Sequence, residues 1–516
     1  MVFTPTQRAT EIDLAGQPSP LLLPSHHAES SRSPYFGPTS PSFSASGPPP
    51  LRKSSTGSFS KLSDFKLDPD AEDEPEGNGV EGVRHVELSV DASEWRHPVF
   101  KTKVLSILRK LRVRLWTSSL LTPSSIHLQK VSGALTNAVF FVSYNPRPEP
   151  TSPSMSPLLT PTMPPTDPAH PPPLARDQFP PTLLLRVYGP SSDSLISRTE
   201  ELRILHVLSG VYGLGPKVYG TFLNGRVEQF FPSRALTAAE LRDPVTCRCI
   251  ARRMRELHSV DLRLLGYEQG RATEPTVWRC IENWADIAQE TLDTLGALGG
   301  KWETWVETFG LHRVKDEVEV YRKWVEANDA RGKGVVFAHN DTQYGNLLHL
   351  DAKLPPNVPT HHQYIVIDFE YAAPNPRGYD IANHFHEWRA DYHHPTLSHS
   401  LQPHFPYPDP SQREDFYRAY LSVEVDARNG EEVMRKRKDV PADKVEALER
   451  EVRVWSPACS VFWALWGIVQ GEAQVRGIVE KSTEPAEFDY LSYAIERLEM
   501  FRTEAREAGV PLPRQR

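Results

Sequence analysis

Two patterns of apolar positions divide the chain into a part rich in short strands and a later part dominated by helices. Apolar runs predict strands at residues 126–128, 138–144, 183–188, 217–222 and 226–230. Asn224-Gly225, which joins the last two runs, is typical of a β-hairpin turn. From about residue 237 the spacing is mainly helical, with a strand-rich interruption at 335–372.

Two helices are expected in the first part of the chain. Apolar residues at helical spacing predict an amphipathic helix over 97–119, whose other face is rich in Lys and Arg. We expect it to pack on its own domain, and contact with a membrane surface is the alternative. A second helix is predicted over 198–208. The pattern therefore indicates an α+β protein with a small β-rich lobe at 120–235 and a large α-helical lobe at 236–505.

The 48 prolines of the chain are unevenly distributed and mark segments outside this pattern. Residues 1–88 form a Ser/Pro-rich tail, and residues 146–181 form a Pro-rich insertion between two predicted strands. Such segments bury too little apolar surface to offset their chain entropy, so we expect both to be disordered. A Pro/His-rich loop lies at 354–362, and residues 506–516 are expected to be a short tail.

Charge and cysteine content narrow the class of protein. The chain has 66 acidic and 58 basic residues, a net charge of −8, which argues against a nucleic-acid-binding protein. The four cysteines lack zinc-site spacing, so we expect reduced thiols in a cytoplasmic protein. The most apolar stretch, Ser460 to Val469, is about half the length of a bilayer helix, so no transmembrane segment is expected.

The strand-rich segment at 335–372 contains the candidate catalytic residues. A short apolar strand leads into His339-x-Asp341-x4-Asn346, and a second apolar strand ends at Asp368. Phosphoryl transfer needs one carboxylate, here Asp341, beside the attacking hydroxyl to orient it and accept its proton. It also needs oxygen ligands that hold Mg²⁺ against the nucleotide phosphates, which Asn346 and Asp368 can supply.

This order of residues resembles the catalytic and metal-binding segments of the protein-kinase superfold. Two departures from that superfold are informative. Asn340 stands where protein kinases carry arginine, and Asp368-Phe369-Glu370 replaces their Asp-Phe-Gly with no Ala-Pro-Glu segment after it. Both departures indicate a kinase that acts on a small molecule.

Longer motifs narrow the resemblance to the choline/ethanolamine kinase family. The segments at 339–346, 367–371 and 377–388 look like the signature of that family, and upstream segments at 185–189 and 214–220 fit it. The resemblance runs from about 97 to 505 and is greatest to fungal choline kinases. It implies a two-lobed protein-kinase-like fold, with ATP as co-substrate and Mg²⁺ as cofactor.

The resemblance also implies a nucleotide site in the small lobe. Backbone N–H groups of a turn at Gly133, with the side chains of Thr136 and Asn137, would cover the phosphates. Arg186 would replace the usual kinase lysine, and Glu201 is its expected helix partner, with Glu200 as an alternative. The other nucleotide-site residues implied are Gln229 and Phe230 at the adenine-binding hinge, with Gln343 and Asp368 beside the nucleotide or metal.

A quaternary ammonium group has no N–H to donate, so aromatic faces and a carboxylate bind it best. Trp463 and Trp466 share one predicted helix face. The residues that match the family's choline pocket are Asp341, Tyr371, Glu387, Tyr392, Trp463, Trp466 and Tyr493. We expect His339 to orient the catalytic loop and Asp380 to support it. His384 and His386 are expected to be structural rather than zinc ligands.

The expected function is a choline kinase, which phosphorylates the choline hydroxyl to give phosphocholine for phosphatidylcholine synthesis. An ethanolamine or dual-specificity kinase is the nearest alternative. A pseudokinase scaffold and an antibiotic phosphotransferase are more distant possibilities, and intact Asp341, Asn346 and Asp368 argue against the scaffold. The resemblance suggests a homodimer, and serines of the tail are candidate sites for regulatory kinases.

Overall fold

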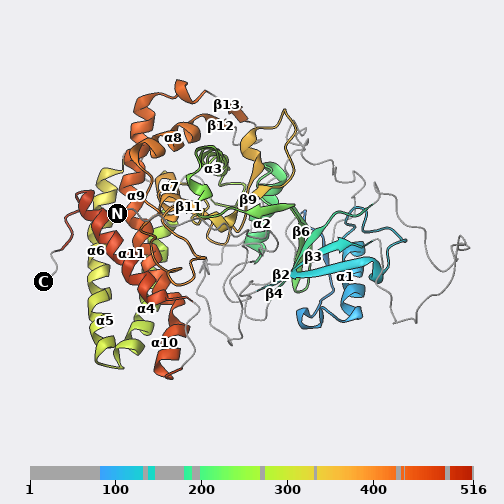
Figure 1. Cartoon of the computed structure of the whole chain (residues 1–516), viewed down its shortest axis with the longest axis horizontal. Coiled ribbons are helices and arrows are strands. Elements are labelled where there is room, and N and C mark those ends of the chain that lie inside the picture. The colour runs from blue at the N-terminus through green and yellow to red at the C-terminus, as the bar shows by residue number, and fades with distance from the viewer. Residues whose placement is uncertain are drawn as a thin grey trace, which may run out of the picture.

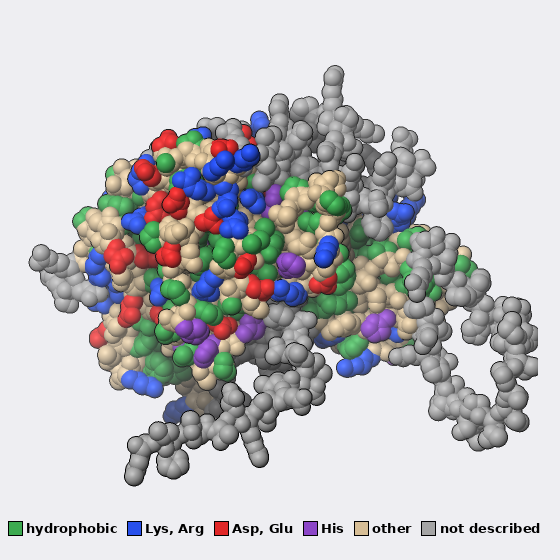
Figure 2. Space-filling view, turned by 45° about the horizontal axis from the view of Figure 1, so that its top comes forward, with side chains coloured by type: hydrophobic (Ala, Val, Ile, Leu, Met, Phe, Trp, Pro, Cys, Tyr) green, Lys and Arg blue, Asp and Glu red, His purple; other side chains and the backbone are tan. Residues whose placement is uncertain are grey.

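The computed structural model describes residues 82–131, 137–145, 179–188, 198–267, 274–329, 334–425, 432–434, 436–482 and 488–513. These residues form the two expected lobes. The small lobe is a sheet with one helix against it, and the large lobe is a layered bundle of helices (Figure 1). On the face of the large lobe shown in Figure 2, acidic and basic side chains are interspersed with apolar ones.

A six-stranded sheet forms the small lobe, with strand order β1-β5-β6-β4-β3-β2. All neighbouring strands are antiparallel except β1 and β5, which are parallel. The five predicted strands are present within one to three residues of their expected ends. The strands are β1 (His85–Val86), β2 (Ile126–Val131), β3 (Asn137–Tyr144), β4 (Leu183–Tyr188), β5 (Val218–Phe222) and β6 (Gly225–Gln229).

Helix α1 (Pro98–Lys110) packs its apolar face on this sheet, as expected. Phe100 lies 5.4 Å from Phe140 of β3, measured between ring centroids. The helix is shorter than the predicted 97–119, because Arg112 and Leu115 adopt left-handed backbone conformations with φ of 52° and 63°. A left-handed residue cannot continue an α-helix, so the chain turns away after Lys110.

Both termini of the folded region differ from the prediction. Strand β1 lies inside the range 1–88 that was assigned to the tail, and it pairs with β5 through His85↔Thr221 and Val86↔Phe222. At the other end, α11 (Tyr490–Glu507) extends into the predicted tail, and Val510 is buried against the core of the large lobe. The described elements therefore extend beyond both ends of the predicted folded region. The rest of the N-terminal tail and most of 146–181 lie outside the described residues.

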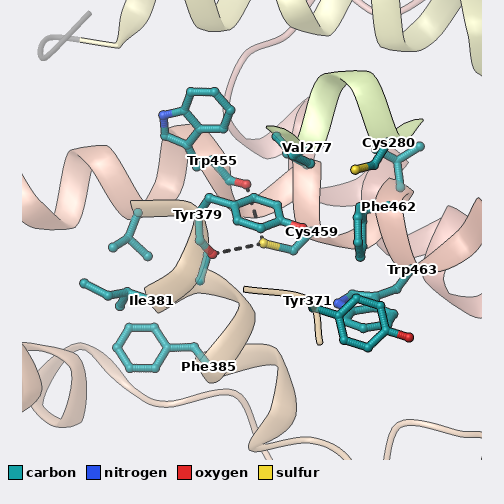
Figure 3. Packing of buried hydrophobic residues seen from close by; sticks show 14 of the residues in the cluster. Val277, Cys280, Tyr371, Tyr379, Ile381, Phe385, Trp455, Cys459, Phe462 and Trp463 are labelled. Carbon is teal, nitrogen blue, oxygen red and sulfur yellow. Dashed lines mark hydrogen bonds between the residues drawn. The ribbon is translucent and has the colours of Figure 1, made fainter. Parts of the chain in front are cut away.

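Helix α2 (Arg198–Val211) connects the sheet to the large lobe, where its apolar residues join the main core. Figure 3 shows the centre of that core, in which Tyr379, Cys459 and Phe462 meet. All four cysteines are buried and free, as expected. The helices of the large lobe are α3 (Pro244–Leu257), α4 (Thr276–Gly296), α5 (Lys301–Phe309), α6 (Leu311–Asn328), α7 (Arg377–Glu387), α8 (Pro410–Leu421), α9 (Ala442–Gln470), α10 (Glu472–Val479) and α11.

Helix α9 is longer than its apolar stretch suggested, and it is the one helix in the described part of the chain long and apolar enough to cross a membrane. Of its most apolar window, 89% is buried inside the protein, as in a core helix. Pro457 interrupts its backbone ladder. The hydroxyl of Tyr321 bridges the interruption, because it accepts from the Ala458 N–H at 3.2 Å and donates to the Val454 carbonyl at 2.7 Å.

Short strands and single helical turns position the catalytic motif. β8 (Val336–Ala338) pairs with β11 (Ala373–Asn375), and β9 (Leu347–Leu350) lies between β10 (Tyr364–Val366) and β7 (Ser233–Ala235). The 3₁₀ turns η7 (Tyr344–Asn346) and η8 (Thr360–Gln363) precede β9 and β10. The remaining regular elements are β12 (Val423–Val425), β13 (Glu432–Met434) and the 3₁₀ turns η2 (Ala92–Glu94), η3 (Pro123–Ser125), η6 (Glu240–Arg242) and η9 (Arg437–Asp439).

The tight packing around Gly225 in the β5–β6 hairpin predicts that a larger side chain is not tolerated there. A Cβ atom at this position would lie 2.2 Å from the carbonyl oxygen of Arg186 and 2.3 Å from the Phe222 ring. We expect Gly225→Ala to lower the free energy of unfolding by about 1–3 kcal/mol through overpacking. Denaturant unfolding measures this change.

Gly210 is the matched control, because it lies in α2 with no atom within 4 Å of an added Cβ. Gly210→Ala is expected to stabilise the protein by roughly 0.5–1 kcal/mol through higher helix propensity. Equal effects of the two substitutions would contradict the close approach at Gly225.

Candidate active site

The catalytic loop that follows β8 is held by one buried carboxylate. Asp380 on α7 accepts hydrogen bonds from the backbone N–H groups of His339 at 3.0 Å and Asn340 at 2.7 Å. The Nε2 of His258, at the end of α3, lies 2.7 Å from the same carboxylate. Asp380 is fully buried, and the expected supporting role of Asp380 agrees with these contacts.

The directions of the pKa shifts of Asp380 and His258 follow from these contacts. Burial alone would raise the pKa of Asp380, but the hydrogen bond from His258 and its charge hold that pKa below the usual value. Burial alone would lower the pKa of His258, but Tyr420 and Asp380 raise it. Both shifts favour the ion pair over the neutral pair, so the charge of Asp380 is compensated inside the core.

The backbone conformation and contacts of Asn340 account for an asparagine where protein kinases carry arginine. Its φ is 64°, a left-handed conformation that asparagine tolerates better than most residues. Its side chain donates to the Tyr371 carbonyl at 2.8 Å and accepts from Asn375 at 3.0 Å. Its own carbonyl accepts from Asn383. Asn340 therefore ties the catalytic loop to β11 and α7 from inside the core.

Asp341 and Asn346 lie together, as the spacing predicted. The Nδ2 of Asn346 donates to the Asp341 carboxylate at 2.8 Å and to the Asp341 carbonyl at 3.0 Å. The amide oxygen of Asn346 is thereby turned away from Asp341. Burial, with the carboxylates of Glu387 and Asp368 nearby, raises the pKa of Asp341 well above its usual value.

Contacts of the neighbouring residue Ile367 hold Asp368 next to the catalytic loop. The Ile367 N–H donates to the Asn346 carbonyl at 3.0 Å, and the Nε2 of His339 lies 3.0 Å from the Ile367 carbonyl. Asp368 has a φ of 66°, which turns the chain sharply at the end of the strand. His339 therefore orients the loop through hydrogen bonds, as expected, and the two candidate metal ligands are adjacent.

Glu370 adds a further acidic group that sequence reasoning did not assign to the site. Desolvation between the lobes and repulsion from Asp368 raise the pKa of Glu370 to about 8, even though part of its side chain stays accessible to solvent. Burial and neighbouring carboxylates therefore disfavour the charged form of Glu370, which a bound cation would favour.

The charged residues of the small lobe are arranged differently from the prediction. Glu201 of α2 forms its ion pair with Arg226 of β6 at 2.9 Å, not with Arg186. The Arg186 Nε lies 3.4 Å from Glu228, which also pairs with Arg226. Burial alone would raise the pKa of Glu201, but Arg226 holds it below the usual value. The expected Arg186–Glu201 pair is therefore replaced by a four-residue network.

The other predicted nucleotide-site residues are placed as follows. Gln229 ends β6, and its backbone N–H donates to the Lys217 carbonyl at 2.8 Å. Phe230 packs on Phe141 of β3 with ring centroids 4.8 Å apart. The side chain of Gln343 accepts from the Gly345 N–H at 2.8 Å and so caps η7. Gly133, Thr136 and the side chain of Asn137 lie outside the described residues.

Four of the predicted substrate-site aromatics form one cluster, which comes from the segment just before β11 and from α9 and α11. Trp463 contacts Tyr371 edge-on at 5.4 Å and Trp466 at 5.3 Å, measured between centroids. Trp466 contacts Tyr493 at 5.7 Å and donates its indole N–H to the Tyr371 hydroxyl at 3.0 Å. Tyr490 also packs on Trp466, with ring centroids 5.8 Å apart. The tertiary structure therefore collects these rings into an aromatic wall.

Glu387 and Tyr392 adjoin the aromatic wall. The Tyr392 hydroxyl donates to Glu387 Oε1 at 3.1 Å, whereas Glu387 Oε2 is buried with no hydrogen-bond partner in the described structure. Burial raises the pKa of Glu387, although the charge of Arg497 opposes this. Arg497 lies 4.4 Å above the Tyr493 ring. An unsatisfied carboxylate oxygen beside aromatic faces is suited to a cationic ligand.

Comparison with known proteins agrees with this geometry. A family model for choline/ethanolamine kinases matches residues 128–502. The chain is 32% identical over 443 residues to the choline kinase of Schizosaccharomyces pombe, which covers 78% of this chain and 88% of that protein. The chain belongs to the choline/ethanolamine kinase family.

Other members of the family extend the comparison. The choline/ethanolamine kinase of Homo sapiens is 33% identical over 330 residues, covering 62% of this chain and 72% of that protein. The solved structure of choline kinase from Cryptosporidium parvum matches with a TM-score of 0.53 and 22% identity, covering 79% of this chain and 97% of that one. This likeness shows the fold, which is the two-lobed protein-kinase-like fold expected from the sequence.

Several residues of the site in this choline/ethanolamine kinase family member were not predicted from the sequence. Arg226 and Glu228 are two residues apart on β6, so their opposite charges lie on the same face of the strand. This spacing could have predicted that they form an ion pair. Arg497 lies four residues after Tyr493 on α11, a helical spacing that could have shown their contact. Glu370 had no comparable signal, because its neighbours come from both lobes.

His384 and His386, for which a structural role was expected, both contact other buried groups of the large lobe. The Nδ1 of His384 lies 2.8 Å from the Thr342 carbonyl, so His384 ties α7 to the catalytic loop. His386 contacts Ser456 at 2.9 Å and Glu504 at 2.8 Å. Both rings therefore cross-link buried elements of the large lobe.

The Asp380 contacts generate a prediction. In Asp380→Ala, the N–H groups of His339 and Asn340 and the His258 ring lose a buried acceptor. We expect the free energy of unfolding to fall by about 3–5 kcal/mol, because a buried ion pair loses one partner. Denaturant unfolding near neutral pH measures the loss.

Asp391→Ala is the control for this substitution. Asp391 is partly exposed and accepts from the His393 N–H at 3.1 Å. Its replacement is expected to cost about 1 kcal/mol or less. A loss for Asp380→Ala no larger than that of the control would show that the loop does not depend on this carboxylate.

Proposed function

We propose that the protein is a choline kinase, which transfers the γ-phosphoryl group of ATP to the hydroxyl of choline. Phosphocholine, the product, would supply phosphatidylcholine synthesis. The observation that carries the proposal is the aromatic wall of Tyr371, Trp463, Trp466 and Tyr493 beside the partly unsatisfied Glu387. Relatives named choline kinase in two yeasts support the choice of substrate.

Asp341 is proposed to orient the choline hydroxyl and accept its proton. Its charge interacts with Tyr392 and Tyr493, and the charge of Glu387 acts on Asp341, so the carboxylate shares one site with the aromatic wall. The hydrogen bond from Asn346 fixes the orientation of the carboxylate. The raised pKa favours proton uptake from the attacking hydroxyl.

Asn346 and Asp368 are proposed to hold Mg²⁺. The donor set fits, because both offer oxygen atoms and the Asn346 amide directs its N–H toward Asp341, leaving its oxygen available. Burial first, and then repulsion between neighbouring carboxylates, raises the pKa values of Asp341 and Glu370, so a bound cation would favour the charged carboxylates of this site. When bound, the cation would neutralise charge on the nucleotide phosphates.

The small lobe is proposed to bind the nucleotide. Arg186, held near Glu228, would contact phosphate oxygens, and Glu201 would act on it through Arg226 and Glu228 rather than directly. Gln229 and Phe230 would hold the adenine at the end of β6. Backbone and side chains at Gly133, Thr136 and Asn137 would cover the phosphates, and Gln343 would lie beside them from the catalytic loop.

Three further parts of the proposal concern the whole chain. The cytoplasm is the proposed location, because four free, buried cysteines are typical of a reducing compartment. A homodimer is the proposed assembly on the strength of the family resemblance. Serines of the N-terminal tail are proposed targets of regulatory kinases, and their phosphorylation in intact cells would be detected as phosphopeptides.

Purified protein with choline and ethanolamine as competing substrates tests the function. We expect a higher kcat/KM for choline, because its methyl groups contact aromatic faces and demand no hydrogen-bond acceptors. A relative named ethanolamine kinase in Saccharomyces cerevisiae is 27% identical over 410 residues and makes ethanolamine the second candidate. A higher kcat/KM for ethanolamine would overturn the choice of choline.

The same assay tests the proposed proton acceptor. Asp341→Asn is expected to lower kcat by about 10²–10⁴, the usual contribution of a general base, with a smaller change in KM. Asp351→Asn, which changes an exposed aspartate just after β9, is the control and should leave kcat unchanged. Full activity of Asp341→Asn would refute the mechanism.

Glu387 is expected to distinguish cationic from neutral alcohols. Glu387→Gln keeps an acceptor for the Tyr392 hydroxyl but removes the charge. We expect KM for choline to rise roughly tenfold or more, because a partly buried carboxylate–cation attraction is lost. Kinetics with 3,3-dimethyl-1-butanol, the neutral analogue of choline, should show no such rise.

Glu499→Gln is the control for Glu387→Gln, because Glu499 is exposed on α11, the helix that carries Tyr493. It should change neither KM. An equal rise in KM for choline and for the neutral alcohol in Glu387→Gln would assign Glu387 a structural role instead of cation recognition.

A further inference from the structure

A cluster of potential metal ligands lies outside the proposed kinase site. Glu256 of α3 meets His361 and His362 of η8, and all three side chains are buried. One carboxylate oxygen of Glu256 lies 2.6 Å from the Nε2 of His361 and 3.3 Å from the Nε2 of His362. The proposed phosphoryl transfer uses none of these groups.

We propose that Glu256, His361 and His362 bind a divalent transition-metal ion of the zinc class, as a structural site. Two imidazole nitrogens and one carboxylate oxygen are donors that zinc accepts. Magnesium, the cation proposed for phosphoryl transfer, prefers oxygen ligands alone. The chemistry of the donors therefore separates this site from the one at Asp368.

The distances between donor atoms are close to those of a tetrahedral site. Ligands at about 2.0–2.1 Å from zinc lie about 3.4 Å from one another in a tetrahedron. The 3.3 Å between Glu256 and His362 already matches this value, and the 2.6 Å between Glu256 and His361 must lengthen. The two imidazole rings are nearly perpendicular, at 87°, with centroids 4.6 Å apart, so they do not stack on one another beside the carboxylate.

The surroundings of the cluster support a bound ion. Arg253, one turn earlier on α3, donates to the second carboxylate oxygen of Glu256 and leaves the first oxygen facing the histidines. Hydrogen-bonded carboxylates of this kind orient metal ligands. His362 is the least buried of the three ligands, with 9% of its surface exposed, so solvent is nearest to the cluster on its side.

The site would join two segments that support the catalytic loop. Glu256 precedes by two residues His258, whose ring binds Asp380. His361 and His362 directly precede β10, the strand that leads to Asp368. A metal at this point would cross-link α3 to β10 and stabilise the large lobe without contacting substrate.

Zinc and cobalt binding to the full-length protein test the proposal. Protein stripped with a chelator is incubated with zinc chloride or cobalt chloride alone, without nucleotide, and then desalted. We expect one zinc ion retained per chain, a higher melting temperature with zinc, and the visible absorption of tetrahedral cobalt(II). A wild-type protein that retains no zinc would overturn the proposal, whatever the behaviour of any variant.

A double variant, His361→Gln with His362→Gln, distinguishes a metal site from a hydrogen-bonded cluster. Glutamine can still donate N–H groups to Glu256 but is a poor zinc ligand. We expect zinc affinity to fall at least tenfold and the cobalt absorption to disappear. Equal zinc affinity and stoichiometry in wild type and double variant would mean that these residues form a hydrogen-bonded cluster only.

His349→Gln is the matched control, because His349 is a partly buried histidine of β9 that packs on Tyr364. It should retain zinc as the wild type does. Choline kinase activity with MgATP, measured on the same preparations, is expected to be unchanged in the double variant. Failure of the zinc proposal therefore leaves the proposed kinase function untouched, and failure of the kinase assay leaves zinc binding measurable.

Discussion

The buried Asp380 carboxylate is the constraint on which the catalytic loop depends. It accepts two consecutive backbone N–H groups from the loop and pairs with His258 of α3. A charge without solvent is costly to bury unless it is paired and hydrogen-bonded. Because these partners satisfy it, movement of the loop away from α7 would expose an uncompensated charge inside the core. The large lobe therefore holds the loop in the geometry that the structure shows.

A second constraint opposes the first. Asp341, Asp368, Glu370 and Glu387 gather where chain segments from both lobes meet. Burial raises the pKa values of Asp341, Glu370 and Glu387, and repulsion from neighbouring carboxylates adds to the shifts of Asp341 and Glu370. Arg497 is a buried positive charge beside this group. The folded chain thus bears electrostatic repulsion that bound cations would relieve, which links the stability of the site to the binding of a cationic alcohol and a metal.

Contacts between residues close in the sequence were predicted better than contacts between distant segments. His339, Asp341 and Asn346 lie within eight residues, so their mutual contacts follow from one turn of the chain and were expected. The partner of Glu201 was not, because Arg186 and Arg226 sit on adjacent strands and either could reach α2. The end of α1 was also missed. Arg112 and Leu115 adopt left-handed conformations without the glycine that usually marks them.

By itself, the sequence determined the two-lobed fold, the catalytic loop and the family, because strand and helix periodicity and ordered motifs are properties of neighbouring residues. Only the tertiary structure decided which aromatic rings form the wall beside Glu387, which arginine pairs with Glu201, and that Glu256 meets two histidines about a hundred residues away. Such contacts depend on how helices and strands pack, and packing depends on the whole core rather than on any one segment.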